Sequence, residues 1–100
     1  MKTTIQTIDG KLIATLIGEL DTAAAAQVEN ELRPLYETTG KHITIDCEQL
    51  NYISSSGLRI LLNILKSAKA SGGDVTLKAV NDDIKNVFKM TGFINLFNFE

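Results

Sequence analysis

The chain has 100 residues, enough for one compact domain and too few for two ordinary ones. Its composition, 44% hydrophobic and 22% charged, is typical of a globular protein and excludes disorder of the whole chain. The net charge is −2, whereas a nucleic-acid partner requires a basic face, so no nucleic-acid binding is expected. No stretch approaches the roughly 20 apolar residues of a membrane span, so no membrane insertion is expected either.

Two strands open the chain and predict a β-hairpin. Residues 4–8 alternate apolar and polar side chains, and residues 11–18 form a second, more apolar run. Between them, Asp9 and Gly10 accept the positive φ angles of a tight turn.

A helix is expected next, capped by Asp21 or Thr22 and beginning in the alanine run 23–26. Pro34 removes a helical hydrogen bond, which predicts a kink or an end near Arg33. Spacings of four and three place three apolar residues on one face of this helix: Val28, Leu32 and Leu35. A loop is expected at Thr38, Thr39 and Gly40.

The middle of the chain predicts a short strand at 42–47, an irregular connection at 48–53 and a long amphipathic helix that follows Ser54, Ser55, Ser56 and Gly57. The helix is expected to end at residues 71–73. Its buried stripe is predicted to contain Leu58, Leu61, Leu62, Leu65 and Ala68, widened by Ile60 and Ile64.

A further strand is predicted at 74–79, and Asn81 can cap a helix that continues to Met90 and ends at Gly92. The last residues form a short strand or packed tail. Its phenylalanines, Phe93, Phe97 and Phe99, are expected in the core rather than in a dimer patch. The oligomeric state stays open.

The predicted order is therefore ββαβαβαβ. Strand–helix–strand alternation implies a mixed, mostly parallel sheet with helices packed on it and an antiparallel pair at its start. One small α/β domain covering residues 1–100 is expected.

Catalytic machinery is hard to assemble from this sequence. The single histidine, His42, begins a strand, where a surface or edge position is more common than a general base. The single cysteine, Cys47, allows neither an internal disulfide nor a cysteine-rich zinc site and is expected to pack inside the sheet. No metal-ligand spacing and no phosphate-binding glycine loop occur. No enzyme activity and no cofactor are expected. Residues 1–6 lack the apolar run of a secretory signal, so a cytoplasmic protein is expected.

The triple serine at 54–56, followed by Gly57, is the most unusual feature of the sequence. One serine is explained by capping of the helix, because its oxygen accepts a free backbone N–H. A second interpretation is a covalent switch. A phosphate at a helix amino terminus is tolerated electrostatically and adds roughly 1.5 to 2 negative charges to the surface where a partner docks.

Three motifs resemble STAS domains, specifically the bacterial anti-sigma-factor antagonists. Residues 18–23 (GELDTA) are similar to the family's Gly-Glu-Leu-Asp junction. Residues 45–53 (IDCEQLNYI) are similar to its strand and connection before the second helix. Residues 54–58 (SSSGL) are similar to its Asp-Ser-Ser/Thr-Gly-Leu signature. The resemblance covers essentially the whole chain.

The resemblance implies a function in transcription control. Such proteins bind an anti-sigma factor that is also a serine kinase, and thereby release a sigma factor. The kinase uses ATP to phosphorylate one serine, which ends binding, and a metal-dependent serine/threonine phosphatase restores it. The phosphorylated serine maps onto Ser55. The implied partner-binding residues are Asp21, Asn51, Ser54, Ser56, Gly57 and Arg59.

One departure from the pattern keeps an alternative open. Ser54 stands where the family commonly has Asp, a residue that could orient the acceptor hydroxyl. STAS domains also serve, without phosphorylation, as scaffold subunits of lipid-transport or signalling complexes. This alternative uses the same fold without the switch. A serine hydrolase is a third hypothesis, but the sequence offers no base for it.

Overall fold

The computed structural model describes residues 1–37 and 42–100, so the loop predicted at Thr38, Thr39 and Gly40 lies outside the described residues. The chain begins with the predicted hairpin, in which β1 (Lys2–Ile8) pairs antiparallel with β2 (Lys11–Leu20). Asp9 and Gly10 connect them with φ angles of 52° and 77°. Two successive positive φ angles match the right-handed twist of the strands, which is why this dipeptide closes the hairpin.

The described strands form one six-stranded sheet, in the order β1-β2-β3-β5-β6. β3 (His42–Asp46), β5 (Asp74–Lys78) and β6 (Asn98–Phe99) follow the hairpin, and every pairing after β1–β2 is parallel. β4 (Leu50–Ile53) lies off this path and pairs parallel with the last residues of β2. The expected mixed, mostly parallel α/β domain is confirmed.

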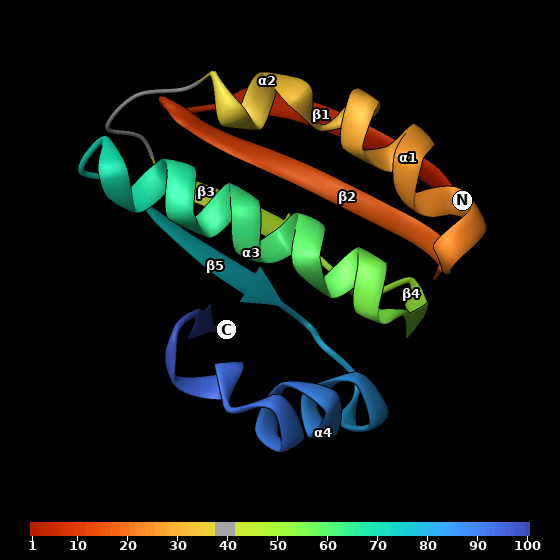
Figure 1. Cartoon of the computed structure of the whole chain (residues 1–100). Helices are drawn as coiled ribbons and strands as arrows, with labels where there is room; N and C mark the ends of the chain where they lie inside the picture. Colours follow the sequence, from red (N-terminus) through yellow and green to blue (C-terminus); the bar gives the residue numbers. More distant parts are fainter. Residues whose placement is uncertain (38–41) are drawn as a thin grey trace.

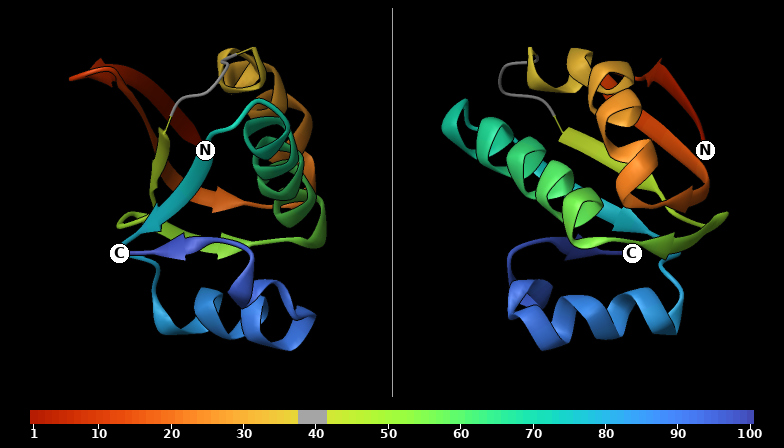
Figure 2. Two further views of the ribbon diagram at one scale, coloured as in Figure 1. Left: turned by 90° about the vertical axis from the view of Figure 1, so that its left-hand side faces the viewer. Right: turned by 45° about the vertical axis from the view of Figure 1, so that its right-hand side comes forward.

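Three helices cover one face of the sheet (Figures 1 and 2). They are α1 (Thr22–Glu31), α2 (Arg33–Tyr36) and α3 (Ser55–Ala70). α4 (Asp82–Thr91) and the 3₁₀ turn η1 (Phe93–Asn95) lie at the β6 edge, far from the hairpin. The break between α1 and α2 confirms the effect expected of Pro34, which stands in the first turn of α2.

A continuous core lies between these helices and the sheet. In α3, Leu58, Ile60, Leu61, Ile64, Leu65 and Ala68 are buried as expected, whereas Leu62 is only half-buried. The ring of Phe88 from α4 makes edge-to-face contacts with Phe97 and Phe99, at centroid distances of 5.4 and 5.6 Å. Phe97 is buried and Phe93 is half-buried against the core, so the expected core position of the terminal phenylalanines is confirmed.

The irregular connection predicted at residues 48–53 is wrong in its second half, where β4 forms. The strand exists because β2 extends to Leu20, beyond its pairing with β3, and so offers free backbone groups to a second partner. Gly18 pairs with Leu50 and Glu19 pairs with Tyr52, so Asn51 is an extra residue in a β-bulge.

Candidate functional site

Three helix amino termini meet at one end of the molecule, on the right-hand side of Figure 1. They belong to α1, α3 and α4, and their N-caps are Asp21, Ser54 and Asn81. The carboxyl ends of parallel strands point to the same edge of a sheet, and this edge is where open α/β sheets bind ligands and partners. The triple serine lies here.

Ser54 is a structural residue. Its hydroxyl oxygen accepts the backbone N–H of Gly57 at 3.1 Å, and its own N–H donates to the carbonyl of Leu20 at 2.8 Å. Only 8% of its surface is exposed. Ser54 therefore performs the N-cap task that the family's Asp would perform, because a hydroxyl and a carboxylate both accept a helix N–H.

Ser55 differs from its neighbour. It is the first residue of α3, its side chain is exposed, and its hydroxyl takes no part in the cap. The free N–H groups and positive dipole end of a helix favour an anion at this position. Ser56, one residue further, is half-buried.

Gly57 permits the close approach of α3 to the end of β2. A Cβ at this position would lie 2.5 Å from Cγ of Leu20 and 3.0 Å from its carbonyl oxygen. Leu20 is fully buried. Ser54 and Gly57, both expected to bind a partner, are therefore buried. They hold the start of α3 against the end of β2.

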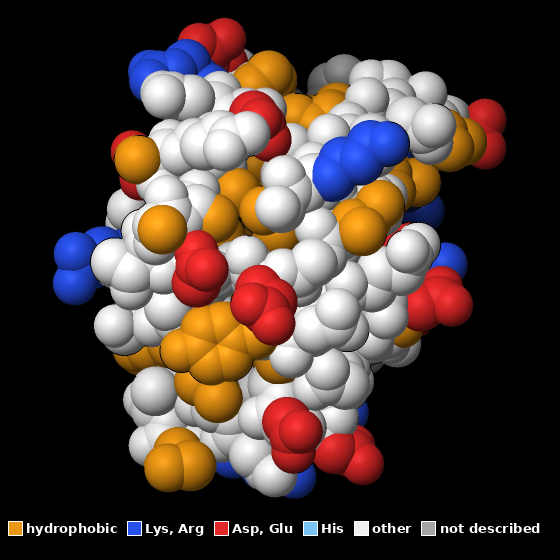
Figure 3. All heavy atoms as spheres, turned by 90° about the vertical axis from the view of Figure 1, so that its right-hand side faces the viewer, with side chains coloured by type: hydrophobic (Ala, Val, Ile, Leu, Met, Phe, Trp, Pro, Cys, Tyr) orange, Lys and Arg blue, Asp and Glu red, His pale blue; other side chains and the backbone are white. Residues whose placement is uncertain are grey.

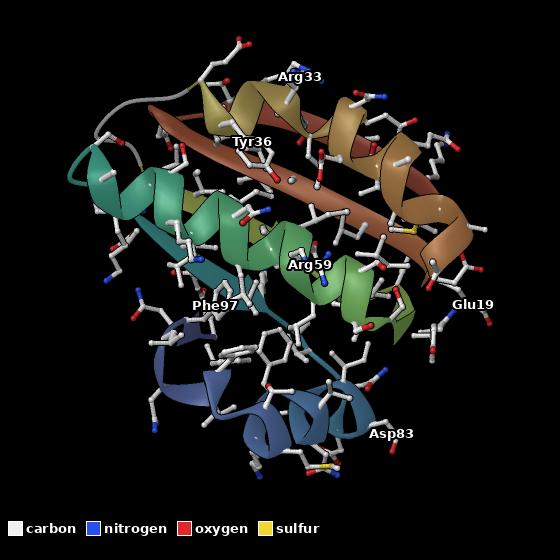
Figure 4. The ribbon with its side chains drawn as sticks, viewed as in Figure 1. Glu19, Arg33, Tyr36, Arg59, Asp83 and Phe97 are labelled. Carbon is white, nitrogen blue, oxygen red and sulfur yellow. The ribbon has the colours of Figure 1, made fainter. Side chains whose placement is uncertain are left out.

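The other expected partner-binding residues are accessible. Asp21 is half-buried and caps α1, its Oδ1 accepting the N–H of Ala24 at 2.8 Å. Asn51 is exposed in the bulge of β4. Arg59 is exposed on α3, in the middle of the view in Figure 4. Thus Asp21, Asn51 and Arg59 lie on three elements, at the cap of α1, in β4 and in the first turns of α3.

Four residues at this end were missed by sequence reasoning. Tyr52 and Glu19 are exposed neighbours on β4 and β2, and Asp82 and Asp83 are exposed in the first turn of α4. Figure 4 shows Glu19 and Asp83 at the same end of the molecule. The two aspartates follow the Asn81 cap directly. This signal marks the start of a helix but does not show that the helix starts next to β4.

His42 lies at the opposite end of β3 from this site, whereas Cys47 follows the carboxyl end of β3 and its carbonyl accepts the N–H of Leu50. His42 is exposed at the start of β3, where its Nδ1 is 2.7 Å from Oδ1 of Asp74. Cys47 is buried as expected, and burial, assisted by the charge of Asp46, raises the pKa of its thiol to about 12. Within residues 1–37 and 42–100, no three His, Cys, Asp or Glu residues gather in a metal-binding arrangement. None of the described helices is long and apolar enough to span a membrane.

The STAS domain profile matches residues 2–100, and the chain belongs to this family. A Bordetella bronchiseptica protein, described as a candidate anti-sigma factor antagonist and named BtrV, is 36% identical over 97% of this chain and 84% of its own. The solved structure of the unphosphorylated anti-sigma factor antagonist SpoIIAA has a TM-score of 0.81 at 20% identity, covering 99% of this chain and 88% of that one. Phosphorylated SpoIIAA of Bacillus has a TM-score of 0.75 at 20% identity, covering 99% and 91%.

Proposed function

We propose that this chain is an anti-sigma-factor antagonist controlled by phosphorylation at Ser55. It binds an anti-sigma factor that is also a serine kinase, in the bacterial cytoplasm, and so frees a sigma factor for transcription. The exposed hydroxyl of Ser55 at the start of α3, beside a serine that is fixed as the cap, carries this proposal. The description of the Bordetella relative supports it.

The chemistry requires only a reachable hydroxyl from this chain. Oγ of Ser55 attacks the γ-phosphorus of ATP held by the kinase. The new O–P bond forms as the bond from the γ-phosphorus to the bridging oxygen breaks, and ADP leaves. A base of the kinase takes the hydroxyl proton. A serine/threonine phosphatase hydrolyses the phosphoserine and restores the free hydroxyl. The chain is thus a substrate and a binding protein, with no catalytic residue or cofactor of its own.

Phosphorylation would end binding without unfolding the domain. The helix terminus accommodates the phosphate electrostatically. A kinase must bring nucleotide phosphates close to Ser55 for transfer, so a phosphate already on Ser55 would meet those phosphates and repel them. The group is also bulky and would be added at the end of the molecule to which we assign the partner interface, with Asp21, Asn51, Ser56 and Arg59 as its further residues.

The N-cap formed by Ser54 supports the antagonist function over the scaffold alternative. That alternative drew on Ser54 in place of the family's Asp. Since Ser54 accepts the Gly57 N–H as a cap, the replacement of Asp by Ser at this position leaves the start of α3 intact. We therefore propose the antagonist function alone.

Phosphate transfer can be tested with purified proteins. The chain is incubated with ATP and, one at a time, with the anti-sigma kinases encoded in the same genome, and then examined by intact mass and peptide mapping. We expect one phosphate on Ser55 of the wild type, none on Ser55→Ala, and a phosphate still on Ser55 in Ser56→Ala, which removes only the neighbouring hydroxyl. Ser55→Ala should still bind the kinase. Undiminished labelling of Ser55→Ala would contradict the site assignment.

A further inference from the structure

The β-bulge in β4 changes which side chains of this strand face solvent. Strict alternation along Leu50, Asn51, Tyr52 and Ile53 would bury one of the two middle residues. Instead Leu50 and Ile53 are both buried, and Asn51 and Tyr52 are both exposed. The extra residue in the bulge allows this pattern, because it shifts the pairing between Gly18 and Glu19. The fold thus holds Tyr52 outward, with 50% of its surface exposed.

Tyr52 differs in position from the other large apolar side chains that are exposed in the described part of the chain. Ile8 is at the hairpin turn, Met90 is in the last turn of α4, and Leu96 follows η1. Tyr52 is three residues before Ser55, at the end of the molecule where the helix amino termini meet.

Three carboxylates lie at the same end of the molecule as Tyr52. Glu19 is paired with Tyr52 across the two strands, and Asp82 and Asp83 begin the helix that Asn81 attaches to β4, through a hydrogen bond from its Nδ2 to the carbonyl of Leu50 at 3.2 Å. Figure 3, a view of this end, shows a hydrophobic patch with acidic side chains above and below it. Within the described residues, none of these three carboxylates forms an ion pair.

We propose that Tyr52 is the aromatic anchor through which this chain docks on its partner kinase, whose matching surface is an apolar pocket rimmed by basic side chains. The proposal rests on the proposed function and names a further residue of the same interface. An exposed tyrosine gives large contact area at low conformational cost, and such residues dominate the binding energy of interfaces. The acidic rim selects a basic rim on the partner and speeds association with it.

The test compares binding of the kinase identified by phosphate transfer to variants of the full chain, by surface plasmon resonance or calorimetry. Tyr52→Ala should weaken binding at least about tenfold, mainly through faster dissociation. Tyr52→Phe keeps the ring and should stay within about threefold of the wild type. Met90→Ala, which removes an exposed apolar side chain at the far end of α4, is the matched control and should bind normally. Glu19→Gln should slow association and reduce its dependence on salt.

The outcomes separate the two proposals. Unchanged affinity of Tyr52→Ala, with wild-type binding and Ser55 labelling intact, overturns the anchor and leaves the proposed function standing. Failure of the wild type to bind any kinase of the genome overturns both. The other possible partner of Tyr52 is a second copy of the chain. Analytical ultracentrifugation of the wild type and Tyr52→Ala tests it by measuring their oligomeric state. If the wild type is a dimer and Tyr52→Ala is a monomer, Tyr52 contacts a second copy of the chain, and the proposal that it docks into a kinase pocket is overturned.

Discussion

Two adjacent serines with the same side chain have different environments because they stand on opposite sides of a helix boundary. Ser54 has extended backbone angles (φ −87°, ψ 170°), which aim its oxygen at the N–H of Gly57. Ser55 is already helical, and its exposed side chain takes no part in the cap. A cap must be fixed to be useful, whereas a phosphorylation site must be reachable. Ser54 meets the first requirement and Ser55, the next residue in the chain, meets the second.

Substitutions at Ser54 should test its structural role. Ser54→Ala removes the acceptor and leaves the Gly57 N–H unsatisfied, so the free energy of unfolding should fall by about 1 kcal/mol. Ser54→Asp should retain wild-type stability, because a carboxylate accepts the same N–H and suits the helix dipole. Urea denaturation followed by circular dichroism measures both. Ser56→Ala is the control and should stay within about 0.5 kcal/mol. A fully stable Ser54→Ala would contradict the cap.

At the scale of elements, the residues 54–57 at the start of α3 are held in place by the strand β4 and by the side chain of Asn81. β4 is only four residues long and pairs with the end of β2 alone. Asn81 then attaches α4 to β4. Its Oδ1 accepts the N–H of Ile84 at 2.8 Å, while its Nδ2 donates to the carbonyl of Leu50 at 3.2 Å. One side chain therefore caps a helix and fixes the strand that leads to Ser55.

The two tasks of Asn81 can be separated by substitution. Asn81→Ala loses both hydrogen bonds and should lower the free energy of unfolding by about 1 to 2 kcal/mol. Asn81→Ser keeps a hydroxyl that can cap the helix but is too short to reach the Leu50 carbonyl, so its loss of stability should be the smaller of the two. Amide hydrogen exchange should accelerate in β4 in both variants. Equal stability losses in the two variants would show that the bond to Leu50 contributes most of the effect.

At the scale of the molecule, a phosphate nearly doubles the net charge of −2. This charge would be added at the end that already carries Glu19, Asp82 and Asp83. The positive end of α3 offsets it locally, so the fold should tolerate the modification. Loss of partner binding then has to come from contacts at the interface and not from unfolding.

This expectation is tested by Ser55→Glu, which places a carboxylate at the phosphate position. The melting temperature should not fall, because an acidic residue in the first turn of a helix is favourable by about 0.3 to 1 kcal/mol. Partner binding should weaken strongly. Thermal denaturation followed by circular dichroism, with Ser55→Ala as reference, measures the first effect. A fall of more than about 5 °C, equivalent to about 1 kcal/mol for a domain of this size, would contradict a switch that leaves the fold intact.

The sequence by itself determined the features that depend on neighbours along the chain. The Asp9-Gly10 turn, the Asn81 cap and the long apolar stripe of α3 are all local patterns, and the structure contains them; of the two caps that the sequence offered for α1, Asp21 and Thr22, the structure uses Asp21. Their order also fixed the α/β class, because alternating strands and helices have few ways to pack. The run Ser55-Ser56-Gly57-Leu58 marked the candidate site from the sequence.

Only the tertiary structure decided which residues near these serines are exposed at the surface. The strand β4, its bulge and the outward position of Tyr52 arise from pairing with β2, whose end is more than 30 residues earlier. Gly57 is required by Leu20, a contact of similar separation in sequence. Local periodicity records the preferences of neighbouring residues, whereas exposure at this end is set by backbone groups and side chains brought together by folding.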